Sequence, residues 1–114
     1  MTAEDLARAH CKPLTGPAMN TGEIASHVPL LNGWAHDDGA ITRRFTFVDF
    51  HRTMAFVNAV AWIAHAEDHH PDLAVGYAAC TVRFNTHSVG GISLNDFICA
   101  AKVDVIYSQR HNAA

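Results

Sequence analysis

Three of the nine histidines in this 114-residue chain fall within residues 65–70, and another, His87, lies downstream. The segment 65–70 reads His-Ala-Glu-Asp-His-His, so two carboxylates lie among the imidazoles. Imidazole is the side chain whose ordinary pKa lets it give and accept protons near neutral pH. A cluster of this composition indicates either acid/base chemistry or a metal site.

A metal site is the first alternative. His65 and His69 are four residues apart, a spacing that places two imidazoles on one face of a helix, and His87 could supply a third nitrogen. The string is His-x-Glu-x-His, however, and differs from the His-Glu-x-x-His of zinc proteases. No pair of cysteines lies nearby. The pattern therefore favours a site without a metal.

Proton transfer without a metal is the second alternative. His69, His70 and His87 would carry it, tuned by Asp68 and Asp96. Each residue also has a purely structural explanation. His70 precedes a proline and could serve merely to end a helix. Asp96 could serve merely to cap a helix, and His87 could simply be solvated. Spacing along the chain does not show whether these groups converge.

The composition is that of a single globular domain, with 49% hydrophobic and 17% charged residues and a net charge of −3. The few basic residues are scattered, which argues against nucleic acid as a ligand. No apolar run is long enough to span a membrane, and the acidic N-terminus lacks a secretory signal. The three cysteines are widely spaced and odd in number, which is typical of reduced thiols, so we expect a cytoplasmic protein. None of them has the context of a catalytic nucleophile.

The elements that must position the histidines follow from periodicity, caps and turn residues. Residues 11–19 hold two prolines and a glycine and indicate a linker. Pro29 is expected to bend or end its helix near His27. The sequence predicts helices over 2–10, 22–31, 50–67 and 94–108, strands over 34–36, 40–48, 72–77 and 79–87, and a tail over 109–114.

The helix over 50–67 has the strongest pattern, and Asp49 is its expected cap. Pro71 disfavours helical geometry at His70, so the helix should end there. The adjacent histidines would then lie at the end of a helix that packs on the core. Their backbone would be anchored by this helix, and their side chains would be open to solvent. The main apolar stripe is Phe50, Met54, Val57, Ala61 and Ala64, and Phe56, Val60 and Ile63 widen it.

The predicted order is helix, two strands, helix, two strands, helix. Strands joined by short turns are antiparallel, and apolar helices must cover a sheet face. We therefore expect an α+β fold in two layers, with a four-stranded antiparallel sheet and its helices on one face. The other face carries Thr, Arg and Asn, which suits water or a partner subunit. The expected organisation is an N-terminal extension or linker (1–20), a domain (21–108) and a tail (109–114).

Together these residues resemble the signature of the pterin-4a-carbinolamine dehydratases, a family also known as the dimerisation cofactor of a homeodomain transcription factor. The resemblance covers roughly residues 22–106 and leaves residues 1–20 outside it. The signature reads here as His65, His69-His70-Pro71, Tyr77, His87 and Asp96, with flanking matches at Gly33-Trp34, Phe45-Thr46-Phe47-x-Asp49-Phe50, Thr86-His87, Gly91-Ile92-Ser93 and Ala100-Ala101-Lys102.

The resemblance implies that the protein dehydrates a 4a-hydroxytetrahydropterin to the quinonoid dihydropterin, without a cofactor or metal. It also implies a homodimer or homotetramer, and an aromatic amino acid hydroxylase as a candidate partner. The family's pattern makes His69 and His87 the acids that serve the hydroxyl on either ring face, while His70 holds and polarises the ring. Asp96 would orient a histidine or bind the ring, and the expected pocket residues are His65, Asp68, Asn85, Thr86 and Ser88.

One position departs from the family pattern, because many members have Glu where this chain has His65. If that Glu normally raises the pKa of a histidine, Asp68 or Asp96 must supply the effect here. The alternative function is a non-catalytic dimerisation or protein-binding module on the same scaffold. Retention of His69, His70 and His87 argues against it, since a pure scaffold has no use for them.

Overall fold

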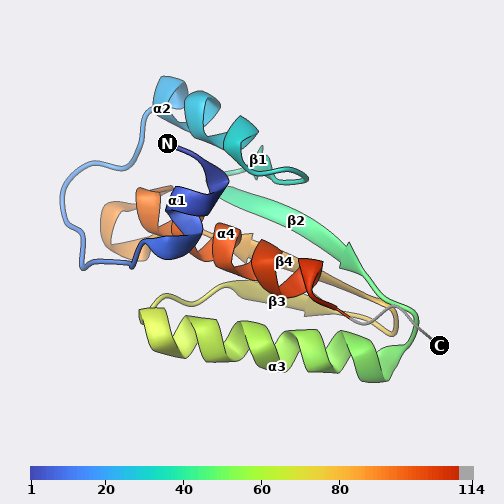
Figure 1. Cartoon of the computed structure of the whole chain (residues 1–114). Coiled ribbons are helices and arrows are strands. Elements are labelled where there is room, and N and C mark those ends of the chain that lie inside the picture. The colour runs from blue at the N-terminus through green and yellow to red at the C-terminus, as the bar shows by residue number, and fades with distance from the viewer. Residues whose placement is uncertain (111–114) are drawn as a thin grey trace.

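The computed structural model describes residues 1–110, which fold into helices and one sheet (Figure 1). The described chain has no helix that combines the length and the apolar character needed to cross a membrane. In chain order the elements are α1 (Ala3–Arg8), α2 (Thr21–His27), the short 3₁₀ helix η1 (Val28–Leu30), β1 (Ala35–Asp37), β2 (Ala40–Thr46), α3 (Phe50–Glu67), β3 (Asp72–Val75), β4 (Ala79–Phe84), the 3₁₀ helix η2 (His87–Val89) and α4 (Leu94–Ser108).

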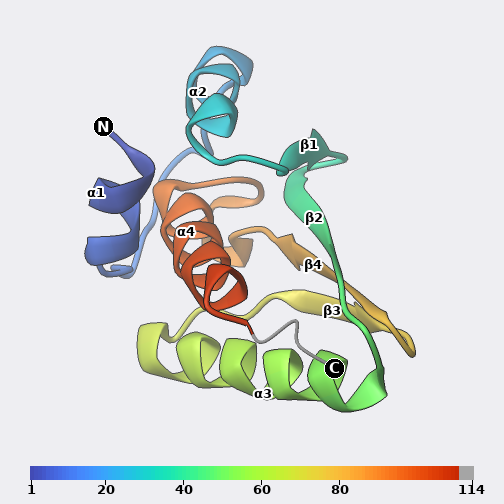
Figure 2. The same cartoon turned by 45° about the vertical axis from the view of Figure 1, so that its right-hand side comes forward.

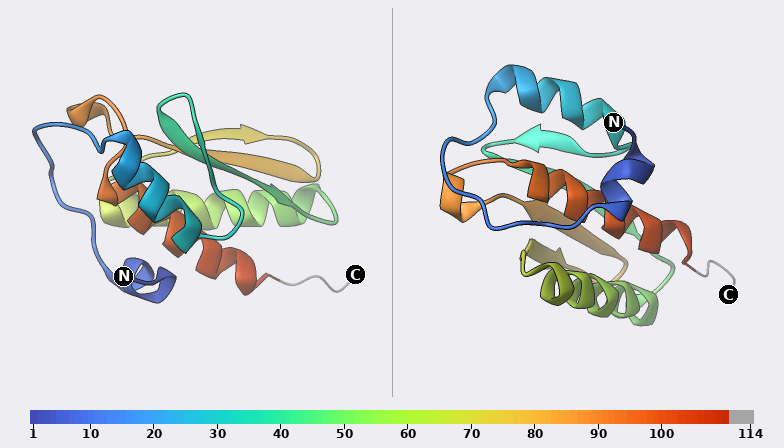
Figure 3. Two further views of the ribbon diagram at one scale, coloured as in Figure 1. Left: turned by 90° about the horizontal axis from the view of Figure 1, so that it is seen from above. Right: turned by 60° about the vertical axis from the view of Figure 1, so that its left-hand side comes forward.

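The four strands form one antiparallel sheet in the order β1-β2-β4-β3. Helices α2, α3 and α4 lie on one face of this sheet, as the view from above shows (Figure 3). The predicted α+β fold with helices on a single face is therefore confirmed. Since β3 is an edge strand, one side of its backbone has no neighbour within the sheet.

The long helices match their predicted limits, whereas α1 (3–8 against the predicted 2–10) is shorter than predicted. Helices α3 and α4 occupy 50–67 and 94–108 as expected. The helix predicted over 22–31 ends at His27, and Pro29 lies in the short η1 that follows. Strands β2, β3 and β4 are shorter than predicted, and β1 begins one residue later than predicted. Strands β2 and β4 pair from Ile41 opposite Phe84 to Thr46 opposite Ala79, and the ladder ends where the partner ends. Beyond that point one further backbone hydrogen bond joins the two segments, from the N–H of Phe47 to the carbonyl oxygen of Ala78 at 2.8 Å.

Burial alternates along β4, where Cys80, Val82 and Phe84 are fully buried. Phe84 lies under the imidazole of His69, with ring centroids 6.0 Å apart and nearly parallel planes. The core therefore reaches the candidate site and supports one of its histidines from below.

The predicted main stripe of α3 is wrong in part. The buried face consists of Thr53, Phe56, Val60, Ile63 and Ala64, whereas Phe50 is 49% exposed and Trp62 is 71% exposed. The set that was expected to widen the stripe is thus the one that meets the sheet. Both stripes are apolar, so periodicity could not decide between them.

The N-terminal residues pack on α4. A capping box of Thr2 and Asp5 starts α1. The side chain of Leu6 is buried, and the ammonium of Lys102 on α4 donates to the carbonyl oxygen of Ala7 at 2.8 Å. Figure 2 shows α4 between α1 and the sheet. The N-terminal segment therefore lies against the helix that starts at the candidate site.

Candidate active site

His69 follows the C-terminal end of α3, after one residue in the left-handed backbone conformation. The helix ends at Glu67, and Asp68 has φ of 51°, a conformation that non-glycine residues rarely adopt. The N–H of His69 donates to the carbonyl oxygen of Ala64 at 3.0 Å, which closes a Schellman-type end. Pro71 follows two residues after His69. The cap at Asp68 turns the chain, so His69 leaves the helix and faces α4.

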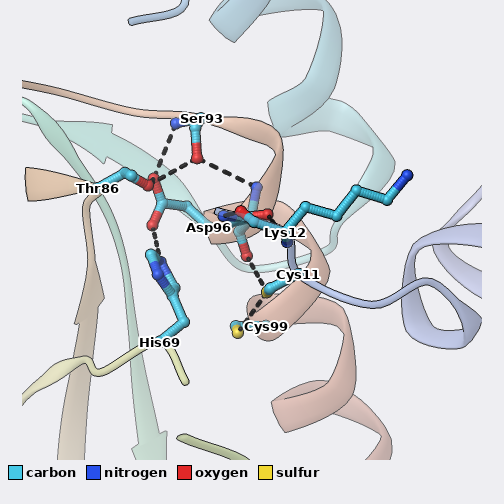
Figure 4. Close-up of polar contacts among 8 residues, drawn as sticks. Cys11, Lys12, His69, Thr86, Ser93, Asp96 and Cys99 are labelled. Atoms are coloured by element: carbon cyan, nitrogen blue, oxygen red, sulfur yellow. Dashed lines mark hydrogen bonds and ion pairs between the residues drawn. The ribbon is translucent and has the colours of Figure 1, made fainter. Parts of the chain in front are cut away.

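Asp96 on the first turn of α4 receives this histidine. Nε2 of His69 lies 2.6 Å from Oδ1 of Asp96. A carboxylate only accepts hydrogen bonds, so Nε2–H donates and the opposite ring nitrogen, Nδ1, remains for a substrate. Figure 4 shows the imidazole on one side of the carboxylate, with Thr86 and Ser93 on the other. The arrangement defines both the tautomer and the orientation of the ring.

The second oxygen of Asp96 ties the loop after β4 to the start of α4. The hydroxyl of Thr86 and the N–H of Ser93 each donate to Oδ2 at 2.9 Å. The hydroxyls of Thr86 and Ser93 lie 2.6 Å apart. The side chain of Asp96 is fully buried, and that of His69 is only 11% exposed to solvent. Asp96 therefore caps α4, as the sequence allowed, and positions a histidine at the same time.

His87 reaches the site from the other side, on the loop after β4. Thr86 and Gly91 bridge this loop, with the N–H of Thr86 donating to the carbonyl oxygen of Gly91 at 2.7 Å. Between them η2 presents His87 and Ser88 to solvent, and Gly90 closes it at φ of 72°. Gly90 and Gly91 thus form a turn, and this turn displays the downstream histidine.

The structure brings the predicted histidines together. His69, His70 and His87 line one open hollow of about 340 Å³, which we call the histidine pocket. This volume falls within the range of roughly 300–1,000 Å³ that small-molecule sites occupy. Four other predicted residues, Asp68, Asn85, Thr86 and Ser88, also line it.

His65 is the predicted site residue that stays apart. It lies in the last turn of α3, is exposed, and is not among the described residues that line the histidine pocket. The left-handed turn at Asp68 directs His69 away from the helix axis, so the four-residue spacing of the two imidazoles does not survive. Across the described residues no three His, Cys, Asp or Glu side chains are arranged to hold a metal ion.

Sequence reasoning missed a second wall beside the site. Residues 10–14, which we call the strap, line a cavity of about 530 Å³ that also includes Asp68, His69, Thr86 and Ser88. We call it the strap pocket. The amide of Asn95 clamps the strap, because its Oδ1 accepts from the N–H of Lys12 at 3.1 Å and its Nδ2 donates to the Lys12 carbonyl at 2.7 Å. Lys12 and Asn95 are 83 residues apart, so no local sequence pattern could have predicted their contact.

Glu67 is the other clamp of the strap. Its carboxylate accepts from the N–H of Cys11 at 2.7 Å and lies 2.9 Å from Nδ1 of His10. Burial favours a higher pKa for Glu67, but these hydrogen bonds and the nearby charge of Lys102 outweigh it and hold the pKa below its ordinary value. The ionised form therefore binds the strap, and its stabilising effect is lost as the pH falls through that lowered pKa.

Comparison with known proteins shows the family to which the chain is similar. The family model described as "Pterin 4 alpha carbinolamine dehydratase" matches residues 17–106. Proteins that carry the name "Putative pterin-4-alpha-carbinolamine dehydratase" are similar over most of their length. The one from Nitrosospira multiformis is 50% identical, covering 93% of this chain and 96% of the relative. The one from Xanthomonas campestris pv. campestris (strain 8004) is 55% identical, covering 91% and 92%.

Solved structures share the fold. The "transcriptional coactivator/pterin dehydratase" from Brucella melitensis is 33% identical with a TM-score of 0.76, covering 79% of this chain and 98% of that one. A "pterin dehydratase-like protein" described as a RuBisCO assembly factor in the alpha-carboxysome is 19% identical with a TM-score of 0.58, covering 70% and 94%. At that identity the likeness concerns the fold alone.

Proposed function

The chain belongs to the pterin 4 alpha carbinolamine dehydratase family, and we propose that it dehydrates a 4a-hydroxytetrahydropterin by metal-free histidine acid/base catalysis. The substrate loses its C4a hydroxyl as water and the proton of N5, and the product is the quinonoid dihydropterin. Loss of water leaves the oxidation state of the pterin unchanged, so the reaction needs no redox cofactor. It needs one group that donates a proton to the departing oxygen and one that accepts a proton from nitrogen.

His69 is the proposed acid on one face of the ring. Its Nδ1 is the nitrogen left for a substrate, because Nε2 is held by Asp96 at 2.6 Å. The carboxylate stabilises the imidazolium form that donates the proton, in the way that a buried Asp supports a catalytic histidine elsewhere. The stacking of His69 on Phe84 keeps the ring from rotating. A donor held in this way loses little orientational freedom when it acts.

His87 is the proposed acid on the opposite face, and His70 holds and polarises the ring. Both are exposed at the rim of the histidine pocket, on separate loops. Asp68, Asn85, Thr86 and Ser88 would orient the pterin through its ring nitrogens and carbonyl. The substrate is the tetrahydropterin cofactor of aromatic amino acid hydroxylases in its 4a-hydroxylated form. Loss of that hydroxyl gives the quinonoid dihydropterin. Such a hydroxylase, acting in the cytoplasm, is therefore the proposed source of the substrate.

The observation that carries this proposal is the convergence of His69, His70 and His87 on one hollow. The test is a direct assay with a synthetic 4a-hydroxytetrahydropterin, in which dehydration is followed by absorbance. The rate is expected to rise in proportion to protein concentration and to stay unchanged in a strong metal chelator. A sample that leaves the uncatalysed rate unchanged, yet retains a partner protein, would favour the non-catalytic binding module.

We also propose a homodimer or homotetramer. Large apolar side chains remain exposed on α3 and at the β3 end of the sheet, including Trp62, Phe50 and Tyr77. Phe50 and Tyr77 stack on each other with ring centroids 6.4 Å apart. Strand β3 is also an unpaired edge, which is a ready site for association. A second copy of this chain would cover such surfaces.

Replacing Trp62 by glutamate should shift the assembly to a smaller species, because it places a charge on an exposed apolar surface. Sedimentation velocity measures the change. Val105→Glu is the matched control, since it adds the same charge at an exposed apolar position on α4. An unchanged sedimentation coefficient in Trp62→Glu would place the subunit contact elsewhere.

A further inference from the structure

Two cysteines from distant parts of the chain lie in contact beside the strap pocket. Sγ of Cys11 in the strap is 3.4 Å from Sγ of Cys99 on α4, and both thiols are free (Figure 4). Cys11 also donates to the carbonyl oxygen of Asn95 at 3.6 Å. The residues are 88 positions apart, so the contact exists only because the strap packs on α4.

The two thiols differ in access. Cys11 is half-buried and lines the strap pocket, whereas Cys99 is fully buried behind it. The hydrogen bond with Cys11, followed by burial, raises the pKa of Cys99, which keeps its sulfur protonated. A small oxidant that enters the strap pocket therefore meets Cys11 first. Cys99 is placed to react second, with the sulfur that has already been oxidised.

We propose that Cys11 and Cys99 form an oxidation-sensitive thiol pair, which a hydroperoxide converts to a disulfide that fastens the strap to α4. The Cys11 thiol gives up its proton as its sulfur attacks one peroxide oxygen, so that an S–O bond forms and the O–O bond breaks. The leaving alkoxide takes up that proton and departs as an alcohol (water for hydrogen peroxide). Cys11 is then a sulfenic acid. The sulfur of Cys99 attacks it, the S–O bond breaks, and the hydroxide leaves as water with the Cys99 proton. The two sulfurs lose two electrons and the peroxide gains them.

The geometry needs little change for this step. A disulfide joins its sulfurs at about 2.05 Å, so the sulfurs must approach by a little more than 1 Å. Glu67 and Asn95 hold the strap from both sides of Cys11, which keeps the thiols adjacent. The cross-link would immobilise a wall of the cavity that His69 and Asp68 share. The proposal does not depend on the proposed dehydratase activity.

The test treats the reduced full-length protein with a small excess of hydrogen peroxide and measures intact mass and a peptide map. The expected product has lost two hydrogen atoms and yields one cross-linked peptide that joins Cys11 to Cys99. The cross-link closes a long loop, so the Tm should rise by about 10 °C relative to the reduced protein. Reductant should reverse both changes.

Three variants make the result specific. Cys11→Ser and Cys99→Ala should each abolish the cross-link and the rise in Tm, and Cys11→Ser is the safer of the two because its site is half-buried. Cys80→Ser is the matched control, since it removes the third free cysteine and should leave the cross-link intact. Added oxygen on Cys11 without loss of hydrogen, or a cross-link that includes Cys80, would overturn the proposal. A cross-linked protein with an unchanged Tm would show that the strap is not fastened.

Discussion

Replacing His69 or His87 by alanine should lower the rate of pterin dehydration by about 10²–10⁴-fold, because each change removes a proton donor. Each histidine would act on a different face of the ring. The loss should therefore depend on the stereochemistry at C4a, with each variant impaired mainly toward one stereoisomer. Steady-state rates on the separated stereoisomers measure the effect.

His36→Ala is the matched control, since His36 is exposed on β1 and belongs to a different part of the sheet. It should retain the full rate. His87→Ala should keep its Tm because the side chain is exposed. His69→Ala exposes one oxygen of Asp96 and should lose some stability, so His69→Gln, which retains a donor, separates folding from catalysis. Full rates in both His69→Ala and His87→Ala would show that the assignment of these two acids is wrong.

The second large effect is expected for Asp96→Asn, which should lower both stability and rate. The carboxylate accepts from Nε2 of His69, the hydroxyl of Thr86 and the N–H of Ser93. An amide has one acceptor oxygen, so at least one of these donors would face an NH₂ group. Because Asp96 is fully buried, the free energy of unfolding should fall by about 3 kcal/mol. Urea unfolding measures this loss.

The catalytic consequence of Asp96→Asn follows from the tautomer of His69. Without a carboxylate, Nε2–H is no longer favoured and the imidazolium is no longer stabilised, so kcat should fall by at least about 100-fold while KM changes little. Asp38→Asn is the matched control, because Asp38 lies in the exposed turn between β1 and β2 and asparagine tolerates its positive φ. A variant that loses stability but keeps kcat and its pH profile would restrict Asp96 to capping α4.

Local sequence patterns predicted the elements of this fold and their order. The limits of α3 and α4 follow from Asp49, Ser93 and the apolar periodicity between caps and breakers. The stop near Pro29 follows from the same kind of reasoning. These features depend on residues within one or two turns of each other, where spacing in the chain and spacing in the structure are nearly the same quantity.

The face of a helix that meets the sheet is a different matter. Periodicity offered two apolar stripes on α3, and only packing decided that Phe56 and Val60 are buried while Phe50 is exposed. The strand ends behave similarly, because a strand stops where its partner stops. Both outcomes depend on which surfaces the rest of the chain presents, and a single segment contains no information on that.

The sequence by itself determined which residue types are available, which helices and strands hold them, and a family resemblance in their spacing. Tertiary structure alone decided that His69 turns toward Asp96, that His65 stays outside the histidine pocket, and that Cys11 meets Cys99. The physical reason is range. Caps and periodicity act between near neighbours, whereas a site is assembled by contacts between distant segments, and those contacts depend on how the whole core packs.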